Sequence, residues 1–97
     1  MQTKIKKTKR LKKITQDERY IVDNFSREML NKIYRRYNRY SPMGWKTLDL
    51  ERLFFLLEGE LNELKRGIEK GDSINIRDES IDIANYACFI YEISKIQ

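Results

Sequence analysis

Apolar residues recur at intervals of three and four along three segments of the chain. In the middle segment they fall at Leu50, Leu53, Leu57, Leu61, Leu64 and Ile68. This spacing follows the 3.6-residue period of an α-helix that buries one side. We therefore predict an amphipathic helix over about residues 48–70.

The other two segments show the same period. The first carries Ile21, Phe25, Met29, Ile33 and Tyr37, and the last carries Ile76, Ile83, Ala87 and Ile90. Thr15 and Glu18 have the spacing of a capping box, which marks a helix start, and Pro42 cannot continue a helix. Further helices are predicted over about residues 15–38 and 75–95.

The connections between the segments indicate how the helices pack. Gly71 and Asp72 are typical of a helix stop, and Asn75 with Asp78 is typical of a helix start, which leaves a loop of about four to six residues. A loop this short makes neighbouring helices antiparallel. The middle helix should begin at an N-cap formed by Thr47 or Asp49. The predicted fold is all-α, an antiparallel bundle of three main helices.

Length and composition are typical of one small, soluble helical domain. Ninety-seven residues bury a limited core, so self-association that completes the core is expected. The single cysteine, Cys88, cannot form an intramolecular disulfide and is interpreted as a small apolar filler. The sequence has neither an apolar leader nor an apolar run near twenty residues. We therefore expect that the chain is not secreted and does not span a membrane. The expected compartment is the cytoplasm.

Positive charge is concentrated at the N-terminus. Residues 1–13 hold seven Lys or Arg and no acid, whereas residues 14–97 hold thirteen basic and fifteen acidic residues. We interpret 1–13 as a basic tail and 14–97 as one helical domain. The tail either keeps the chain in solution or binds nucleic acid, and the absence of an interleaved aromatic residue favours the first. A second basic cluster, which ends the first helix, is either a solvated helix end or a contact for polyanions; it comprises Lys32, Arg35, Arg36 and Arg39.

Two pairs of acids stand on the last two predicted helices. Glu60 and Glu63 are three residues apart, as are Glu79 and Asp82, so each pair lies on one side of its helix. The antiparallel hairpin brings the two pairs to the same height. At 100° per residue Glu79 falls inside the apolar stripe of the last helix, which is unusual for an acid.

Four facing carboxylates repel one another unless a cation lies between them. An all-oxygen ligand set in a chain without histidine suits Mg²⁺ or Mn²⁺. Magnesium keeps water ligands and takes others from phosphates, so the pattern predicts a phosphate-containing substrate. The chain has no P-loop, no zinc-ligand spacing and no Ser-His-Asp set.

Other residues near these acids are candidates for substrate contacts. Asn85 follows Asp82 by three and is either a surface residue or a hydrogen-bond partner of a sugar or phosphate. Trp45 is either a core plug or a stacking surface for a base. Lys46, Lys65 or an arginine of a partner subunit could supply the positive charge that offsets the charge of the phosphates.

The acidic pattern resembles that of the MazG-like all-α nucleoside triphosphate pyrophosphohydrolases. Their signature is E-x-x-E, a spacer and E-x-x-D, matched here by Glu60, Glu63, Glu79 and Asp82. GW at Gly44, LEGELNEL and DESIDIANYA are similar to small phage and prokaryotic members, so the likeness spans about residues 43–91. The resemblance implies Mg²⁺-dependent cleavage of a nucleoside triphosphate to monophosphate and pyrophosphate. It also implies a homodimer or homotetramer.

The catalytic base is expected to be Glu63 or Glu60, and the sequence does not choose between them. Nor does it choose the nucleobase, so a relative of the dUTPases or dCTPases fits equally. A different class of function is also open: a small helical module that binds nucleic acid or a larger assembly through residues 1–13 and the basic cluster, with the acids vestigial.

Overall fold

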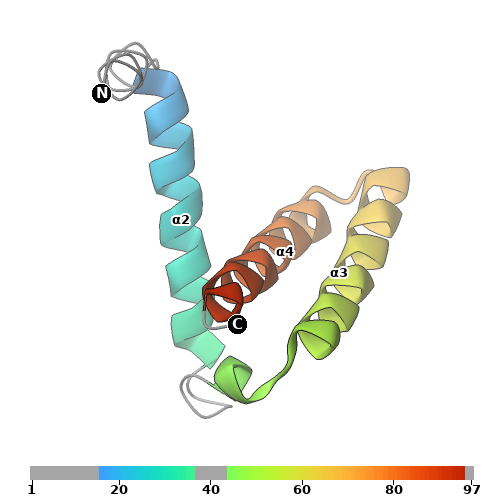
Figure 1. Cartoon of the computed structure of the whole chain (residues 1–97). Helices are drawn as coiled ribbons and strands as arrows, with labels where there is room; N and C mark the ends of the chain where they lie inside the picture. The colour runs from blue at the N-terminus through green and yellow to red at the C-terminus, as the bar shows by residue number, and fades with distance from the viewer. Residues whose placement is uncertain (1–15, 37–43, 96–97) are drawn as a thin grey trace, which may run out of the picture.

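The computed structural model describes residues 16–36 and 44–95. Every regular element within these ranges is a helix. Figure 1 shows helix α2 (Gln16–Arg36), the short 3₁₀ helix η1 (Gly44–Thr47), and helices α3 (Leu50–Lys70) and α4 (Ser73–Ser94). The predicted all-α fold is confirmed. The predicted basic tail 1–13, the capping box at Thr15 and the break at Pro42 lie outside the described residues. No described helix is long and apolar enough to cross a membrane.

Helix α3 begins and ends where local chemistry predicts. Asp49 is its N-cap, and the Asp49 carboxylate accepts a hydrogen bond of 2.7 Å from the backbone N–H of Arg52. Gly71 follows its last residue with φ of 66°, in the left-handed region that glycine adopts without steric cost. Of the two predicted N-caps Asp49 is therefore the correct one, and Gly71 as a helix stop is confirmed.

The connection to α4 is shorter than predicted. Asp72 is the N-cap of α4 and accepts a hydrogen bond of 3.2 Å from the N–H of Asn75, so Asn75 lies inside the helix and the loop has two residues, Gly71 and Asp72. The left-handed Gly71 reverses the chain within one residue, which lets the next residue cap the following helix. Helices α3 and α4 consequently form a tight antiparallel hairpin (Figure 1).

Of the described glycines, Gly67 is the one that lies against α4. A Cβ atom at Gly67 would lie 3.3 Å from Asn75 Nδ2 and from Ile76 Cγ1, whereas a Cβ at Gly59 would meet nothing within 4 Å. We expect Gly67→Gln to lower the free energy of unfolding by about 1–3 kcal/mol because the side chain forces the helices apart. Gly59→Gln should raise it by about 0.5–1 kcal/mol through helix propensity. Chemical denaturation of both variants tests this, and equal effects would contradict it.

The hydrophobic core of the described residues is small. Leu53 and Ile93 are its buried apolar residues, and α2 contributes none. The predicted stripe of α3 is only partly covered, since Leu61 and Ile68 are 45% and 60% exposed. Helix α3 packs mainly on α4, so a single neighbouring helix leaves the edges of its stripe in solvent.

Helix α2 lies across α4 rather than alongside the hairpin (Figure 1). Of its predicted stripe, Met29 and Ile33 are half-buried, whereas Ile21 is 63% exposed. The Asn85 side-chain amide donates a hydrogen bond of 3.3 Å to the Met29 carbonyl, which ties the two helices together. The crossing brings the C-terminal half of α2 to the acids of α4.

Candidate metal centre

One face of α4 buries three polar residues in succession. Glu79, Asp82 and Asn85 are 9%, 5% and 6% exposed. They are three residues apart, so they lie above one another on the helix surface. Burying polar side chains is costly unless each finds a partner, and three in a row indicate a purpose other than packing. The prediction that Glu79 faces the interior is confirmed, and the interpretation of Asn85 as a surface residue is wrong.

Helix α3 adds a third carboxylate to this face. One carboxylate oxygen from each of Glu60, Glu79 and Asp82 lies within 4.8 Å of the others, and we call these three residues the acidic group. The short hairpin explains the meeting, because it sets the two helices antiparallel with both acid pairs near the same height.

Glu63 lies outside the acidic group. Its side chain is 48% exposed and forms an ion pair with Arg66, three residues further along α3. The expectation that four acids converge is thus met by three of them. A step of three residues offsets Glu63 from Glu60 by about 60° around the helix axis. Because Glu60 already lies at the edge of the contact with α4, this offset is enough to leave Glu63 in solvent.

The electrostatics of Glu79 reflect this crowding. Burial, followed by the hydrogen bond and charge of Glu60 and the charges of Asp82 and Asp78, raises the pKa of Glu79 to about 8. A proton on Glu79 therefore relieves the repulsion near neutral pH. Its Oε2 atom is buried and has no hydrogen-bond partner among the described residues.

Two cations of α2 reach the same face. Lys32 Nζ lies 2.8 Å from Asp78 Oδ1 and 2.8 Å from Asp82 Oδ2, and Arg36 Nη2 lies 2.9 Å from Asp82 Oδ1. Burial alone would lower the pKa of Lys32, but hydrogen bonds and charges of Asp78 and Asp82 outweigh it and raise that pKa. Burial likewise opposes charge on Arg36, and the charge of Asp82 leads the contributions that raise its pKa. Both oxygens of Asp82 thus have a cationic partner.

From the sequence, Lys46, Lys65 or an arginine of a partner subunit was expected to supply positive charge to the substrate, rather than these two cations of α2. Lys46 and Lys65 are both exposed, whereas the Lys32 side chain is 11% exposed. Reading Lys32 as part of a solvated helix end is therefore wrong. A signal was present in the sequence, because Lys32 and Arg36 are four apart, as are Asp78 and Asp82.

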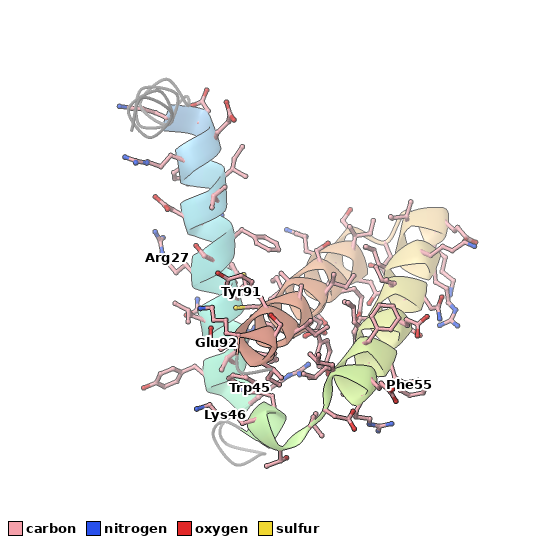
Figure 2. The ribbon with its side chains drawn as sticks, in the orientation of Figure 1. Arg27, Trp45, Lys46, Phe55, Tyr91 and Glu92 are labelled. Atoms are coloured by element: carbon pink, nitrogen blue, oxygen red, sulfur yellow. The ribbon has the colours of Figure 1, made fainter. Side chains whose placement is uncertain are left out.

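Trp45 packs η1 against α4. Its ring is stacked on Phe89 with centroids 4.6 Å apart and planes 5° from parallel, and Tyr86 meets Phe89 edge-on at 6.4 Å. Figure 2 shows Trp45 and Lys46 on η1, and Lys46 Nζ is 6.0 Å from the Trp45 ring centroid. Phe89 follows Asp82 by seven residues, so it lies on the same face about 10 Å along α4. The aromatic stack is therefore a neighbour of the acidic group.

The arrangement has the composition that a hard divalent cation requires. The acidic group offers oxygen ligands only. A cation bound there would give Glu79 Oε2 the partner that it lacks among the described residues. Glu60, Glu79 and Asp82 are the residues that could hold Mg²⁺ or Mn²⁺. Asn85 Oδ1 is also buried without a partner, one turn beyond Asp82.

The chain is similar to an archaeal protein. Neither a protein-family model nor a solved structure matches the chain. An uncharacterized protein of the archaeon Archaeoglobus fulgidus is 36% identical over 73 residues, which cover 73% of this chain and 78% of the archaeal protein. At this identity and coverage, the chain belongs to the same protein family as that archaeal protein.

Proposed function

We propose that the chain is a Mg²⁺-dependent nucleoside triphosphate pyrophosphohydrolase of the MazG-like kind. The observation that carries the proposal is the buried carboxyl of Glu79, whose Oε2 has no partner although Glu60 and Asp82 stand beside it. A group assembled only for stability would not leave a buried oxygen unsatisfied, because this costs about 1–3 kcal/mol. A cation that binds all three carboxylates removes the cost.

The chemistry of the surroundings supports a phosphate substrate. Mg²⁺ is commonly bound by a few carboxylates and completes its shell with water and substrate phosphates. The acidic group supplies such carboxylates, and Lys32 and Arg36 supply positive charge next to them. The E-x-x-E and E-x-x-D spacing of this family resemblance points to the same class of reaction.

In the proposed reaction, water adds to phosphorus and the bond between the α and β phosphates breaks, which yields a nucleoside monophosphate and pyrophosphate. When bound, the metal would lower the pKa of the attacking water and offset charge on the leaving group. The proton of the water passes to a carboxylate. The sequence offered Glu63 or Glu60 as this base. We propose Glu60, because it belongs to the acidic group, whereas Glu63 is half-exposed and paired with Arg66.

The nucleoside would extend from the acidic group toward η1. Asn85 lies one turn beyond Asp82 and has a free buried oxygen that could accept a hydrogen bond from a sugar hydroxyl. Trp45 uses one ring face for Phe89, which leaves a base the outer surface of this stack. Exposed Lys46 lies next to it.

Pyrophosphate release from a panel of ribo- and deoxyribonucleoside triphosphates, with Mg²⁺ or Mn²⁺, tests the proposal. We expect stoichiometric monophosphate and pyrophosphate from at least one nucleotide, and none in EDTA. Release of single orthophosphate, or no release from any nucleotide, would overturn the assignment. The panel also identifies the preferred base and sugar.

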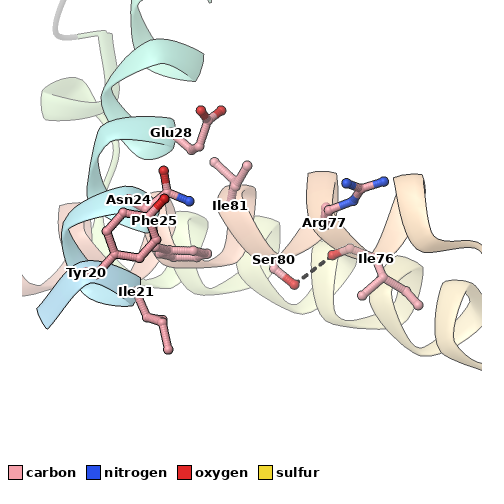
Figure 3. A pocket seen from close by; sticks show the side chains of 9 residues that line it. All are labelled: Tyr20, Ile21, Asn24, Phe25, Glu28, Ile76, Arg77, Ser80 and Ile81. Atoms are coloured by element: carbon pink, nitrogen blue, oxygen red, sulfur yellow. Dashed lines mark hydrogen bonds between the residues drawn. The ribbon is translucent and has the colours of Figure 1, made fainter. Parts of the chain in front are cut away.

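The proposal includes self-association, because α2 leaves apolar residues uncovered. A groove of about 360 Å³ lies between α2 and α4, and Figure 3 shows Tyr20, Ile21 and Phe25 on one side of it and Ile76 and Ile81 on the other. Tyr20 and Ile21 are 71% and 63% exposed, and the core holds few buried apolar residues. A second copy of the chain would bury this surface and enlarge the core.

We expect Ile21→Glu to weaken the resulting dimer or tetramer by about a hundredfold, because it places an unpaired charge in the apolar contact. Asn31→Glu, on an exposed polar position of the same helix, is the matched control and should leave assembly unchanged. Analytical ultracentrifugation measures the dissociation constants. A wild-type chain that stays monomeric at high micromolar concentration would contradict the expectation.

A further inference from the structure

The cations of α2 occupy the same carboxylate that the proposed metal would use. Lys32 and Arg36 each contact a different oxygen of Asp82, at 2.8 Å and 2.9 Å. A divalent cation at the acidic group would bring further positive charge next to them. Metal binding must therefore compete with these contacts or rearrange them.

Losing Asp82 as a partner is not neutral for Lys32. Its side chain is 11% exposed, and a buried ammonium without an anion is strongly unfavourable. Asp78 stays in contact at 2.8 Å, but one of the two carboxylates that offset its burial would be neutralised by the metal. The position then favours a new anion close to the metal.

From this geometry we propose that Lys32 and Arg36 form a phosphate clamp, which rests on Asp82 in the free protein and transfers to the substrate's phosphates when metal and nucleotide bind. The inference rests on the proposed function and names two residues that would hold its substrate. Before binding, the clamp neutralises Asp82. A bound metal would neutralise Asp82 in their place, and Lys32 and Arg36 then bind phosphate oxygens.

The two residues suit adjacent phosphates. They are four apart on α2, so their Cβ atoms are about 5–6 Å apart, and their charged ends already meet at one carboxylate. The Arg36 side chain is 45% exposed, so an incoming nucleotide can reach its planar guanidinium, which binds phosphate oxygens in pairs. Lys32 offers a compact charge with three donors on a flexible stem.

Two binding measurements separate the clamp from a purely structural ion pair. Lys32→Met removes the charge and keeps an unbranched apolar stem. We expect the variant to bind Mn²⁺ about five- to tenfold more tightly than the wild type, because a competing cation is gone. Its affinity for pyrophosphate in the presence of Mn²⁺ should fall about tenfold or more, because a phosphate ligand is gone.

Mn²⁺ binding is read by electron paramagnetic resonance of the free ion, and pyrophosphate binding by calorimetry. Lys70→Met, the same change at an exposed lysine at the end of α3, should alter neither affinity, and Lys32→Arg should restore most of the pyrophosphate affinity. Arg36→Gln serves as a second variant should Lys32→Met fail to fold by circular dichroism. Unchanged pyrophosphate affinity, or weaker Mn²⁺ binding, in a folded clamp variant would overturn the proposal.

The outcomes keep this inference distinct from the proposed function. A wild-type chain that binds Mn²⁺ and pyrophosphate with the expected variant effects, but cleaves no nucleotide, would retain the clamp and lose the hydrolase. Nucleotide cleavage with pyrophosphate affinity indifferent to Lys32 and Arg36 would retain the hydrolase and lose the clamp.

Discussion

Glu79→Gln is expected to reduce pyrophosphate release by about a hundred- to a thousandfold while the chain stays folded. Glutamine has the shape of the neutral carboxylic acid that burial and Glu60 favour at this position, so packing between α3 and α4 is preserved. It cannot become the anionic ligand that a hard cation needs. The variant should therefore lose metal-dependent turnover and keep its helical circular dichroism spectrum.

A matched control makes the result specific. Glu69→Gln changes the same side chain at an exposed position near the end of α3, outside the acidic group, and should leave turnover within about twofold of wild type. Equal turnover of the Glu79→Gln variant and the wild type would show that the acidic group does not carry the reaction. The assignment of the reaction to the acidic group would then fail even if pyrophosphate were released.

Local signals in the sequence were sufficient for the elements that carry the acids. The stripe that includes Leu53 and Leu57 predicted α3. One of the two N-cap candidates, Asp49, marks its start and Gly71 its end, because caps act through hydrogen bonds between near neighbours. The interior position of Glu79 followed from the same period. The antiparallel hairpin then brought Glu60 to Glu79 and Asp82, but it left Glu63 in solvent, because spacing alone does not specify how each helix is rotated about its axis.

The start of α4 was misread because two capping patterns lie next to each other. Asp72 and Asn75 are both favourable N-cap residues. Each is followed three residues later by another polar residue, so the sequence fits a helix start at either position. In the structure the left-handed Gly71 reverses the chain before Asp72. The Asp72 carboxylate can therefore accept a hydrogen bond from the Asn75 N–H, and Asp72 is the N-cap. Such a choice depends on backbone geometry that the residue types do not specify.

The role of Lys32 could not be predicted from periodicity for a different reason. Lys32 and Asp78 are 46 residues apart, and their contact depends on where α2 crosses α4. An apolar stripe specifies which side of a helix is buried, but it leaves the crossing point open. Here the partners on α4 are the buried Asp82 and the more exposed Asp78, so charge pairing with Lys32 and Arg36 makes the contact at one place.

The stability of the metal-free chain is expected to fall as pH rises from about 5 to about 8. Glu79 has a pKa of about 8 in the folded chain against its usual 4.5, so between these values the folded state holds a proton that the unfolded state has released. The free energy of unfolding then decreases with rising pH, and the loss is complete above pH 8. A shift of this size corresponds to roughly 3–5 kcal/mol, which lowers the melting temperature by more than about 10 °C in a chain this small.

Thermal melts in EDTA across this pH range, for the wild type and the Glu79→Gln variant, measure the effect. The variant cannot ionise at this position, so it should melt near the wild type at pH 5 and well above it at pH 8. Adding Mn²⁺ at pH 8 should stabilise the wild type, because the cation replaces the lost proton between the carboxylates, and should leave the variant almost unchanged. Melting temperatures of the two chains that run parallel from pH 5 to 9 would show that Glu79 is ionised in the folded chain throughout. In that case the repulsion within the acidic group would have to be relieved by Lys32 and Arg36 alone.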